Sequence, residues 1–189
     1  MSVEIFNDVE RGEIEAVKIA IKTQLRILLA DLPTESYHYF KECIVTGGMT
    51  ASLFHGESPN DWDIYLRDED TANQFELFIL NDDAIDIVKD VNPEYRVAVK
   101  VEGKLVTENA ITFKNDLQVI TRADKEHRKT FDFIHCMPYF DMATQQLYIS
   151  RAQYDAIKRK TLIKNRDHAL SLSGQRINKF IERGWKFVW

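Results

Sequence analysis

The chain has 189 residues, of which 44% are hydrophobic and 29% charged, and its formal net charge is -5. This length suits one domain with a core of its own, and the composition excludes a disordered or fibrous chain. No apolar run is long enough to span a bilayer, and the first residues lack the basic-then-apolar pattern of a secretory signal. With only Cys43 and Cys136 and no metal-type spacing between them, we expect a cytoplasmic protein with reduced thiols and no membrane partner.

The first third of the sequence predicts helices on both sides of a strand. Apolar residues at helical spacing predict an amphipathic helix over residues 9–31, carried by Ile14, Val17, Ile21, Leu25, Leu28 and Leu32. Pro33 stops it, and a second short helix follows at residues 35–41. "CIVTGG" (43–48) predicts a buried strand that runs into a tight turn, and "MTASLFHG" (49–56) predicts a short helix ended by its glycine.

The rest of the chain alternates strands and helices. "DWDIYLR" (61–67) predicts a strand and "EDTANQFELFIL" (69–80) a helix of about three turns. Residues 95–121 are rich in β-branched residues between turn signals and predict an antiparallel meander. "FDFIHCMPYF" (131–140) predicts a further strand. The chain then turns helical, in the segments 151–165 and 174–185.

These elements predict an α/β or α+β fold, a mixed sheet flanked by helices with a basic helical tail. We divide the chain into a core at residues 1–150 and a tail at 151–189 that packs on it. The tail holds ten Lys and Arg against three Asp and Glu, whereas the remainder holds 15 against 27. Such a tail is either a nucleic-acid footprint or a solvated helical face. The candidates for nucleic-acid contact are Lys158, Arg159, Lys160, Arg176 and Lys179.

Two aspartates stand one residue apart in the predicted strand 61–67. Because side chains alternate along a strand, Asp61, Asp63 and Tyr65 share one face, and the other face is apolar. Two carboxylates so close together repel each other unless a cation neutralises them. Mg²⁺ or Mn²⁺ bound by carboxylate oxygens and by substrate phosphates satisfies that need.

A glycine turn precedes this pair by a few residues. Gly47 and Gly48 allow backbone N–H groups to approach a phosphate, and the helix that follows offers the positive end of its dipole. A phosphate cradle beside paired carboxylates predicts metal-dependent phosphoryl or nucleotidyl transfer. A solvated turn is the alternative for an isolated Asp-x-Asp. A calcium loop is excluded, because Leu66 and Ala72 stand where it needs glycine and glutamate.

The stretch "GGMTASLFHGESPNDWDIYL" (47–66) resembles the signature of the nucleotidyltransferase superfamily of DNA polymerase β type. It is most similar to the head of class II CCA-adding enzymes and bacterial poly(A) polymerases, whose spacing of glycines and Asp-x-Asp is reproduced by Gly48, Gly56 and Asp61. Those enzymes usually carry Arg-Asp in the helix, where this chain has Ala51 and Ser52. The resemblance still offers Ser52 as a phosphate contact.

The superfamily usually has a third carboxylate on a neighbouring strand, flanked by apolar residues. In "FDF" this nominates Asp132, and Asp116 in "KND" is the rival. His135 is either a phosphate or general-base group or a core histidine. "ENAITF" is similar to an asparagine-alanine motif of the class II head, which nominates Asn109 for nucleotide contact.

The resemblance implies transfer of a nucleoside monophosphate from an NTP to an acceptor hydroxyl. Asp61, Asp63 and Asp132 are then the metal-binding and catalytic residues, and Gly47 and Gly48 hold the phosphates. The stretches "NAITF", "FDFIHC" and "FIERGW" are also similar to nucleotidyltransferase-like proteins of tailed phages. The chain is too short for the helical regions with which CCA-adding enzymes grip tRNA, so their substrate is not carried over. The basic tail makes RNA, such as a tRNA end, the first acceptor to consider, and a protein side chain or a small molecule stays open. The alternative is a non-catalytic nucleotide- or RNA-binding relative of the same fold.

Overall fold

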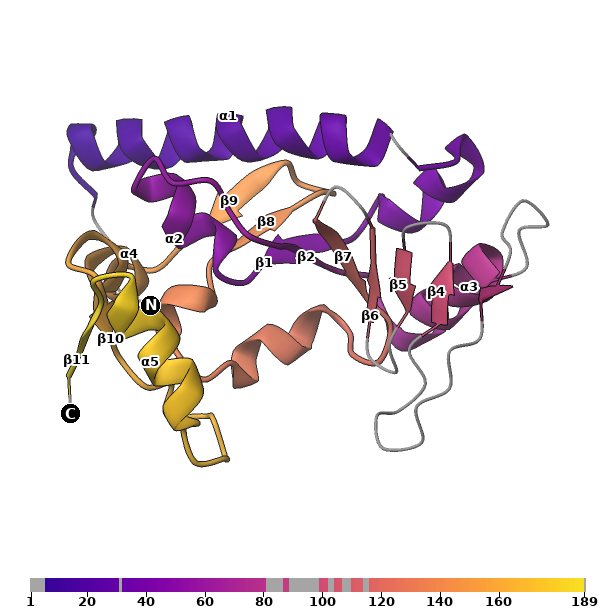
Figure 1. Cartoon of the computed structure of the whole chain (residues 1–189). Coiled ribbons are helices and arrows are strands. Elements are labelled where there is room, and N and C mark those ends of the chain that lie inside the picture. Colours follow the sequence, from indigo (N-terminus) through magenta and orange to yellow (C-terminus); the bar gives the residue numbers. More distant parts are fainter. Residues whose placement is uncertain are drawn as a thin grey trace.

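A computed structural model describes residues 6–30, 32–80, 87–88, 99–101, 104–106, 110–113 and 116–188. Their strands form one mixed sheet in the order β3-β4-β5-β6-β7-β2-β1-β8-β9, and a separate pair β10-β11 (Figure 1). The strands are β1 (Ile44–Thr46), β2 (Trp62–Tyr65), β3 (Ile87–Val88), β4 (Val99–Val101), β5 (Lys104–Val106), β6 (Ala110–Thr112), β7 (Leu117–Ile120), β8 (Tyr139–Asp141), β9 (Gln146–Tyr148), β10 (Thr161–Leu162) and β11 (Lys186–Phe187).

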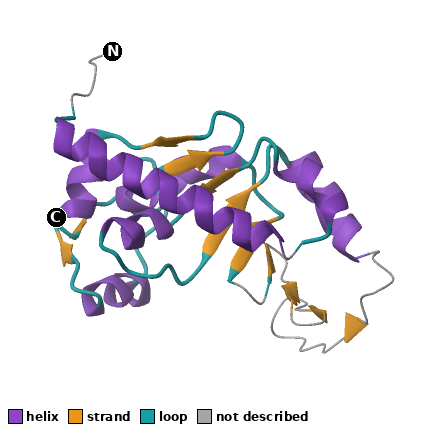
Figure 2. Ribbon diagram, turned by 90° about the horizontal axis from the view of Figure 1, so that it is seen from above, coloured by secondary structure: helices purple, strands orange, loops and turns teal. Residues whose placement is uncertain are grey.

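The helices flank this sheet, which confirms the predicted fold class. They are α1 (Asp8–Ala30), α2 (Met49–Phe54), α3 (Glu69–Leu80), α4 (Arg151–Lys158) and α5 (Gly174–Glu182), with 3₁₀ turns at Thr34–Phe40, Lys125–Thr130 and Ile134–Cys136. Viewed from above, α1 runs across the sheet, and the strands pass beneath it (Figure 2). None of the helices described is long and apolar enough to cross a membrane.

The centre of the sheet explains where the paired aspartates lie. Strand β2 pairs antiparallel with β1 and parallel with β7. Trp62 and Ile64 are buried against α1 and α3 in the main hydrophobic cluster, so Asp63 and Tyr65 lie on the opposite face. This alternation is as the sequence predicts. The antiparallel meander is also confirmed in β4, β5, β6 and β7, whereas its predicted turn residues Gly103, Lys114 and Asn115 lie outside the described residues.

The predicted strand at 131–140 is wrong over most of its length. Only its last two residues belong to a strand, β8, and Phe133 forms an isolated bridge with Lys164. The reason is local hydrogen bonding: the Asp132 carboxylate accepts from the Phe133 N–H at 2.9 Å, and the Cys136 N–H donates to the Phe133 carbonyl. These bonds close the segment into a bend and a 3₁₀ turn. Its cross-chain backbone bonds, from the Ile134 N–H to the Ile163 carbonyl and from the Asn165 N–H to the Asp132 carbonyl, go to the tail and not to the main sheet. Asp132 therefore lies in a bend, not on a strand of the sheet.

The predicted helix at 151–165 ends early, at Lys158. Lys160 has a φ of 48°, in the left-handed region, which a continuing helix excludes. The next residues form β10, which pairs parallel with β11 near the end of the chain. The tail is thus helical in α4 and α5 and contains a small strand pair between and after them.

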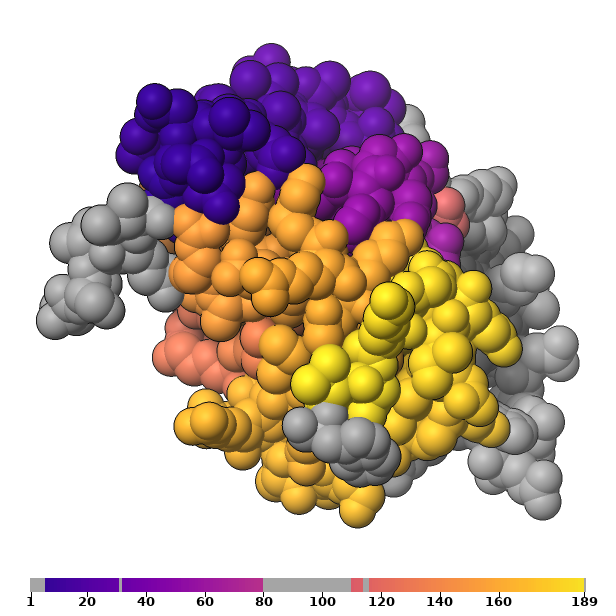
Figure 3. Space-filling model, turned by 90° about the vertical axis from the view of Figure 1, so that its left-hand side faces the viewer, coloured from indigo at the N-terminus to yellow at the C-terminus, as the bar shows by residue number. Residues whose placement is uncertain are grey.

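A second hydrophobic cluster joins this tail to the rest of the molecule. It contains Ala51 of α2 and Phe133, together with the buried tail residues Ile157, Leu162, Phe180 and Trp185. Figure 3 shows the segments α4 and α5, in orange and yellow, side by side at one end of the molecule, next to the start of α1 in indigo. Because α5 packs through this cluster, its polar side is directed toward the face of the sheet that carries Asp63. A division of the chain at residue 150 remains a prediction.

Candidate nucleotide and metal site

The turn between β1 and α2 is built around one glycine. Gly47 has a φ of 85°, and a Cβ atom placed on it would collide with Oδ2 of Asp63. Its N–H donates to the Cys136 carbonyl at 3.1 Å. Gly48, in contrast, has a helical φ of -72°, and a Cβ there would meet nothing within 4 Å. Position 47 therefore requires glycine, because of its left-handed φ and the adjacent Asp63 carboxylate. Neither reason applies at position 48.

The aspartate pair lies at the start of β2, beside this turn. Asp61 is exposed, whereas Asp63 is partly buried between Thr46 of β1 and Gln118 of β7. Burial, reinforced by the negative charge of Asp61, raises the pKa of Asp63 to about 6, although Arg176 and Lys179 act in the opposite direction. No hydrogen bond or ion pair engages either carboxylate within the part of the chain that the structure describes. Asp63 is thus a carboxylate whose charge is incompletely compensated.

Helix α5 supplies the cations that face this pair. Arg176, Lys179 and Arg183 are spaced by three and four residues and share one side of the helix. The Arg183 guanidinium donates to the Ser52 hydroxyl and to the Glu57 carboxylate, both at 3.0 Å. This contact fastens α5 to α2.

These elements enclose a pocket of about 90 Å³, which brings together six of the predicted site residues: Gly48, Ser52, Asp61, Asp63, Arg176 and Lys179. Gly47 lies directly behind it, against Asp63. The pocket is also lined by Arg183, which the helical spacing after Arg176 and Lys179 already indicates, and by Asn60 and Cys136, which the sequence prediction did not assign to it. No sequence signal pointed to Cys136, because its segment was predicted to be a strand.

Asp132, the predicted third carboxylate, lies outside this pocket. It is buried, forms an ion pair with Arg176 and lines a neighbouring pocket instead. The rival Asp116 is exposed just before β7, with a φ of 63°, and its carbonyl accepts from the Trp62 N–H. On β7 itself, the residue in register with Asp63 is Gln118, whose amide donates to Thr112. No group of three or more Asp, Glu, His or Cys residues that could hold a metal is found among the described residues.

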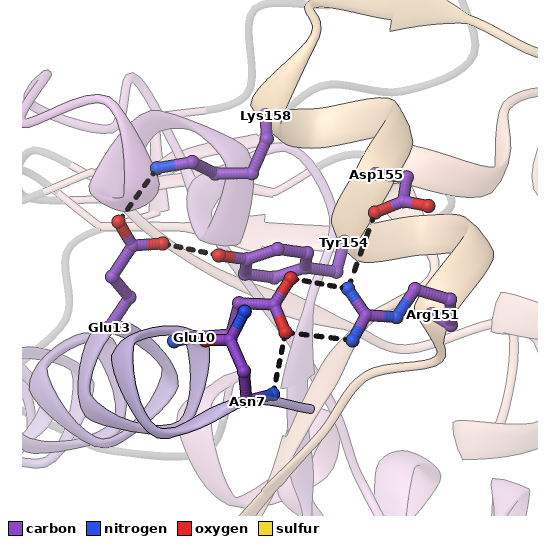
Figure 4. Close-up of polar contacts among 7 residues, drawn as sticks. All are labelled: Asn7, Glu10, Glu13, Arg151, Tyr154, Asp155 and Lys158. Carbon is purple, nitrogen blue, oxygen red and sulfur yellow. Dashed lines mark hydrogen bonds and ion pairs between the residues drawn. The ribbon is translucent and has the colours of Figure 1, made fainter. Parts of the chain in front are cut away.

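The basic residues predicted to contact nucleic acid differ in their partners. Figure 4 shows Lys158 in an ion pair with Glu13 of α1, at 3.1 Å, beside the paired Glu10 and Arg151. Lys160 pairs with Glu57 at 2.8 Å, and Arg159 is exposed. Arg176 and Lys179 line the pocket instead.

Two further residues complete the comparison with the sequence. Asn109 lies outside the described residues. His135 is fully buried, with its ring 4.1 Å from that of Trp185 and 4.7 Å from that of Phe180. Burial, and then the charges of Arg176 and Arg183, lower the pKa of His135 to about 3. His135 is therefore a neutral core residue in this structure.

The two glycines of the turn provide a matched pair of substitutions. We expect Gly47→Ala to lower the free energy of unfolding by about 2 kcal/mol or more, because of its left-handed φ and the collision with Asp63. Gly48→Ala should stay within about 1 kcal/mol of the wild type. Urea denaturation of both variants measures the difference, and equal stabilities would contradict the described geometry.

The raised pKa of Asp63 predicts a dependence of stability on pH. The folded state holds the proton more tightly than the unfolded state, so stability is lost as the pH rises from about 4 through about 6. The rise from 3.8 to about 6 corresponds to about 3 kcal/mol at most. Asp63→Asn should therefore be more stable than the wild type at pH 7, and this advantage should vanish below pH 4. Thermal melts of both proteins between pH 3.5 and 8 check this, and a variant that is less stable at pH 7 would show that the carboxylate supports the fold.

The chain is similar in structure to CCA-adding enzymes, at low sequence identity. A Thermotoga maritima CCA-adding enzyme complexed with tRNA matches with a TM-score of 0.53 and 19% identity, over 99% of this chain and 44% of that one. A CCA-adding enzyme in complex with ATP matches with a TM-score of 0.49 and 17% identity, over 87% of this chain and 41% of that one. The chain thus spans less than half of the length of these structures. The first likeness shows a nucleotidyltransferase fold.

Sequence comparison with whole families gives a more specific result. No curated protein matches the sequence. The model of one family, described as "Gabija anti-defense 2 family protein", matches residues 19–160. This match covers more than half of the sequence and includes the glycine turn, the aspartate pair and α4. The chain therefore belongs to the Gabija anti-defense 2 family.

Proposed function

We propose that this protein is a metal-dependent nucleotidyltransferase that transfers a nucleoside monophosphate from an NTP to an acceptor hydroxyl. The observation that carries the proposal is the meeting of Asp61 and Asp63 with Arg176, Lys179 and Arg183 in one pocket. Carboxylates on one wall suit cations, and cations on the other suit phosphates. The proposal is also supported by the fold, which this chain shares with a CCA-adding enzyme.

The two aspartates fit a hard divalent cation. They offer only oxygen donors, they lie on one face of β2, and neither has a hydrogen-bond or ion-pair partner within the described segments. Asp61 and Asp63 would hold Mg²⁺ or Mn²⁺, and we keep Asp132 as the proposed third ligand. When bound, the ion would polarise the phosphoryl group and neutralise its developing charge. Binding it would also offset the burial and the repulsion by Asp61, which together raise the pKa of Asp63.

The chain's own groups position the substrate around that centre. Lys179 and Arg183 would neutralise the triphosphate, and Ser52 would donate to it once Arg183 turns toward the phosphates. Gly47 would keep the β1–α2 turn close to Asp63, and Gly48 would expose its backbone N–H. Such a site acts mainly by orientation and by fixed charge.

Asp132 requires one rearrangement before it can serve. Its carboxylate is occupied by Arg176, so Arg176 must move to the substrate before Asp132 can reach the centre. Gln118, in register with Asp63, leaves no carboxylate at that point of the neighbouring strand. This observation favours a second candidate, a non-catalytic member that binds a nucleotide as part of an anti-defense role.

For the acceptor we propose RNA first, since the similar Thermotoga maritima enzyme was solved with a tRNA. The basic tail lends this proposal less support than its composition suggests. Lys158 and Lys160 are each paired with a glutamate, and Arg176 and Lys179 lie in the pocket. Lys164 and Arg166 are exposed and have no ion-pair partner among the described residues.

The test is a transfer assay on the purified full chain. Each of the four labelled NTPs is incubated with Mg²⁺ or Mn²⁺ and total RNA, and label in the RNA is measured. Wild type should incorporate label only with metal, and Asp61→Asn or Asp63→Asn should lower the rate at least about a hundredfold, because charge neutralisation is the main catalytic contribution. Asp70→Asn, in the exposed first turn of α3, is the control and should match the wild type.

The two candidate functions give different results in this assay. Activity that survives both pocket substitutions would overturn the proposed site. Metal-dependent NTP binding by the wild type without transfer to any acceptor would favour the non-catalytic candidate.

A further inference from the structure

A second, larger pocket adjoins the first, and Arg176 lines both of them. It has a volume of about 450 Å³ and lies between the 3₁₀ turn at 125–130 and the loop before α5. Its lining includes the rings of His127 and Phe131, the polar groups of Asp167 and His168, and Leu170. The proposed transfer chemistry uses Asp132 and Arg176 from its lining and assigns no role to the rest of this pocket.

Strand β2 connects the two pockets. Tyr65 follows Asp63 on the same face, which places it about 7 Å farther along the strand. The Tyr65 ring is stacked on that of His127, with centroids 6.1 Å apart, and lies 5.9 Å from that of Phe131. The two aromatic residues that line the second pocket therefore pack against the side chain one strand repeat beyond Asp63.

The first pocket is too small for a whole nucleotide. Its 90 Å³ is well below the roughly 300–1,000 Å³ of pockets that hold drug-sized ligands. It suits a phosphate group and an ion. If the phosphates bind beside Asp63, the nucleoside must lie outside this pocket, and the second pocket is of suitable size at its edge.

We propose that the second pocket holds the base of the incoming NTP, and that it favours a base with an exocyclic amino group. The inference rests on the proposed nucleotidyltransferase function and adds to it the place where the base is recognised. One ligand then spans both pockets, with its base against Phe131 and His127 and its phosphates beside Asp63. Arg176 stands at the junction, where it exchanges its ion pair with Asp132 for one with the phosphates.

The chemistry of the lining supports both parts of this assignment. Any nucleic-acid base can stack on an aromatic side chain, and the rings of Phe131 and His127 line the pocket. Its edge offers acceptors: Asp167 is a carboxylate, and His168 donates from Nδ1 to the Thr130 carbonyl at 2.8 Å, which leaves Nε2 as an acceptor in the neutral ring. An acceptor facing position 4 of a pyrimidine pairs with the amino group of cytosine and not with the carbonyl oxygen of uracil. CTP and UTP differ at this position and at N3, which accepts in cytosine and donates in uracil, and they are the natural comparison.

The experiment separates the base from the phosphates. Dissociation constants for CTP, UTP and inorganic tripolyphosphate, each with Mg²⁺, are measured by calorimetry on the full chain. The wild type should bind CTP more tightly than UTP, and both more tightly than tripolyphosphate. Phe131→Leu keeps an apolar side chain at a position that packs against the second cluster, and His127→Ala changes an exposed one. Each should weaken CTP binding about fivefold or more, the lower end of stacking by one ring, and leave tripolyphosphate unchanged.

Tyr148→Ala removes an exposed ring of β9, outside both pockets, and should leave all three constants unchanged. The proposal is overturned if both pocket variants bind CTP as the wild type does while tripolyphosphate still binds, or if CTP and UTP bind equally. A wild type that fails to bind even tripolyphosphate with Mg²⁺ would instead remove the proposed function on which the inference rests.

Discussion

The carboxylate of Asp63 lies against the backbone of Gly47 and close enough to Asp61 for the two charges to repel each other. Burial and this repulsion raise its pKa to about 6, so at neutral pH the folded chain carries an unfavourable charge. The surrounding structure accommodates this charge without a hydrogen bond or ion pair to it among the described residues. Gly47 leaves room for the carboxylate, and Arg176 and Lys179 of α5 lower its pKa in part. An incompletely compensated carboxylate at the edge of a cationic pocket is the feature on which the proposed binding of a cation together with a polyanion rests.

Much of the arrangement around Asp63 could be predicted from the pattern of neighbouring residues in the sequence. The alternation along β2 places Asp63 on the face opposite Trp62 and Ile64, and the positive φ of Gly47 fits a residue without a Cβ atom. Both depend on neighbours in sequence, where spacing is informative. The bend at Asp132 was not foreseen, because apolar residues on both sides are typical of a strand, and only the hydrogen bond from the Phe133 N–H to its carboxylate shows otherwise.

The sequence pattern could not predict contacts between residues that are distant in the chain. The composition of the tail predicted its basic residues but not their partners. The glutamates that neutralise Lys158 and Lys160 lie more than one hundred residues earlier, in α1 and just after α2. Likewise, α5 reaches the pocket because Phe180 and Trp185 pack into the second cluster, which is a tertiary fact. The packing of α5 therefore places Arg176 and Lys179 at the site, whereas ion pairs with glutamates fasten Lys158 and Lys160 to the core.

The central claim is that Asp61 and Asp63 together hold a divalent cation with a nucleotide. Binding of Mn²⁺ to the full chain, followed by electron paramagnetic resonance with and without an NTP, tests it most directly. The account predicts that the wild type binds Mn²⁺ more tightly when the NTP is present, and that Asp63→Asn, although stably folded, loses this binding. An Asp63→Asn protein that binds Mn²⁺ and the NTP as tightly as the wild type would contradict the account.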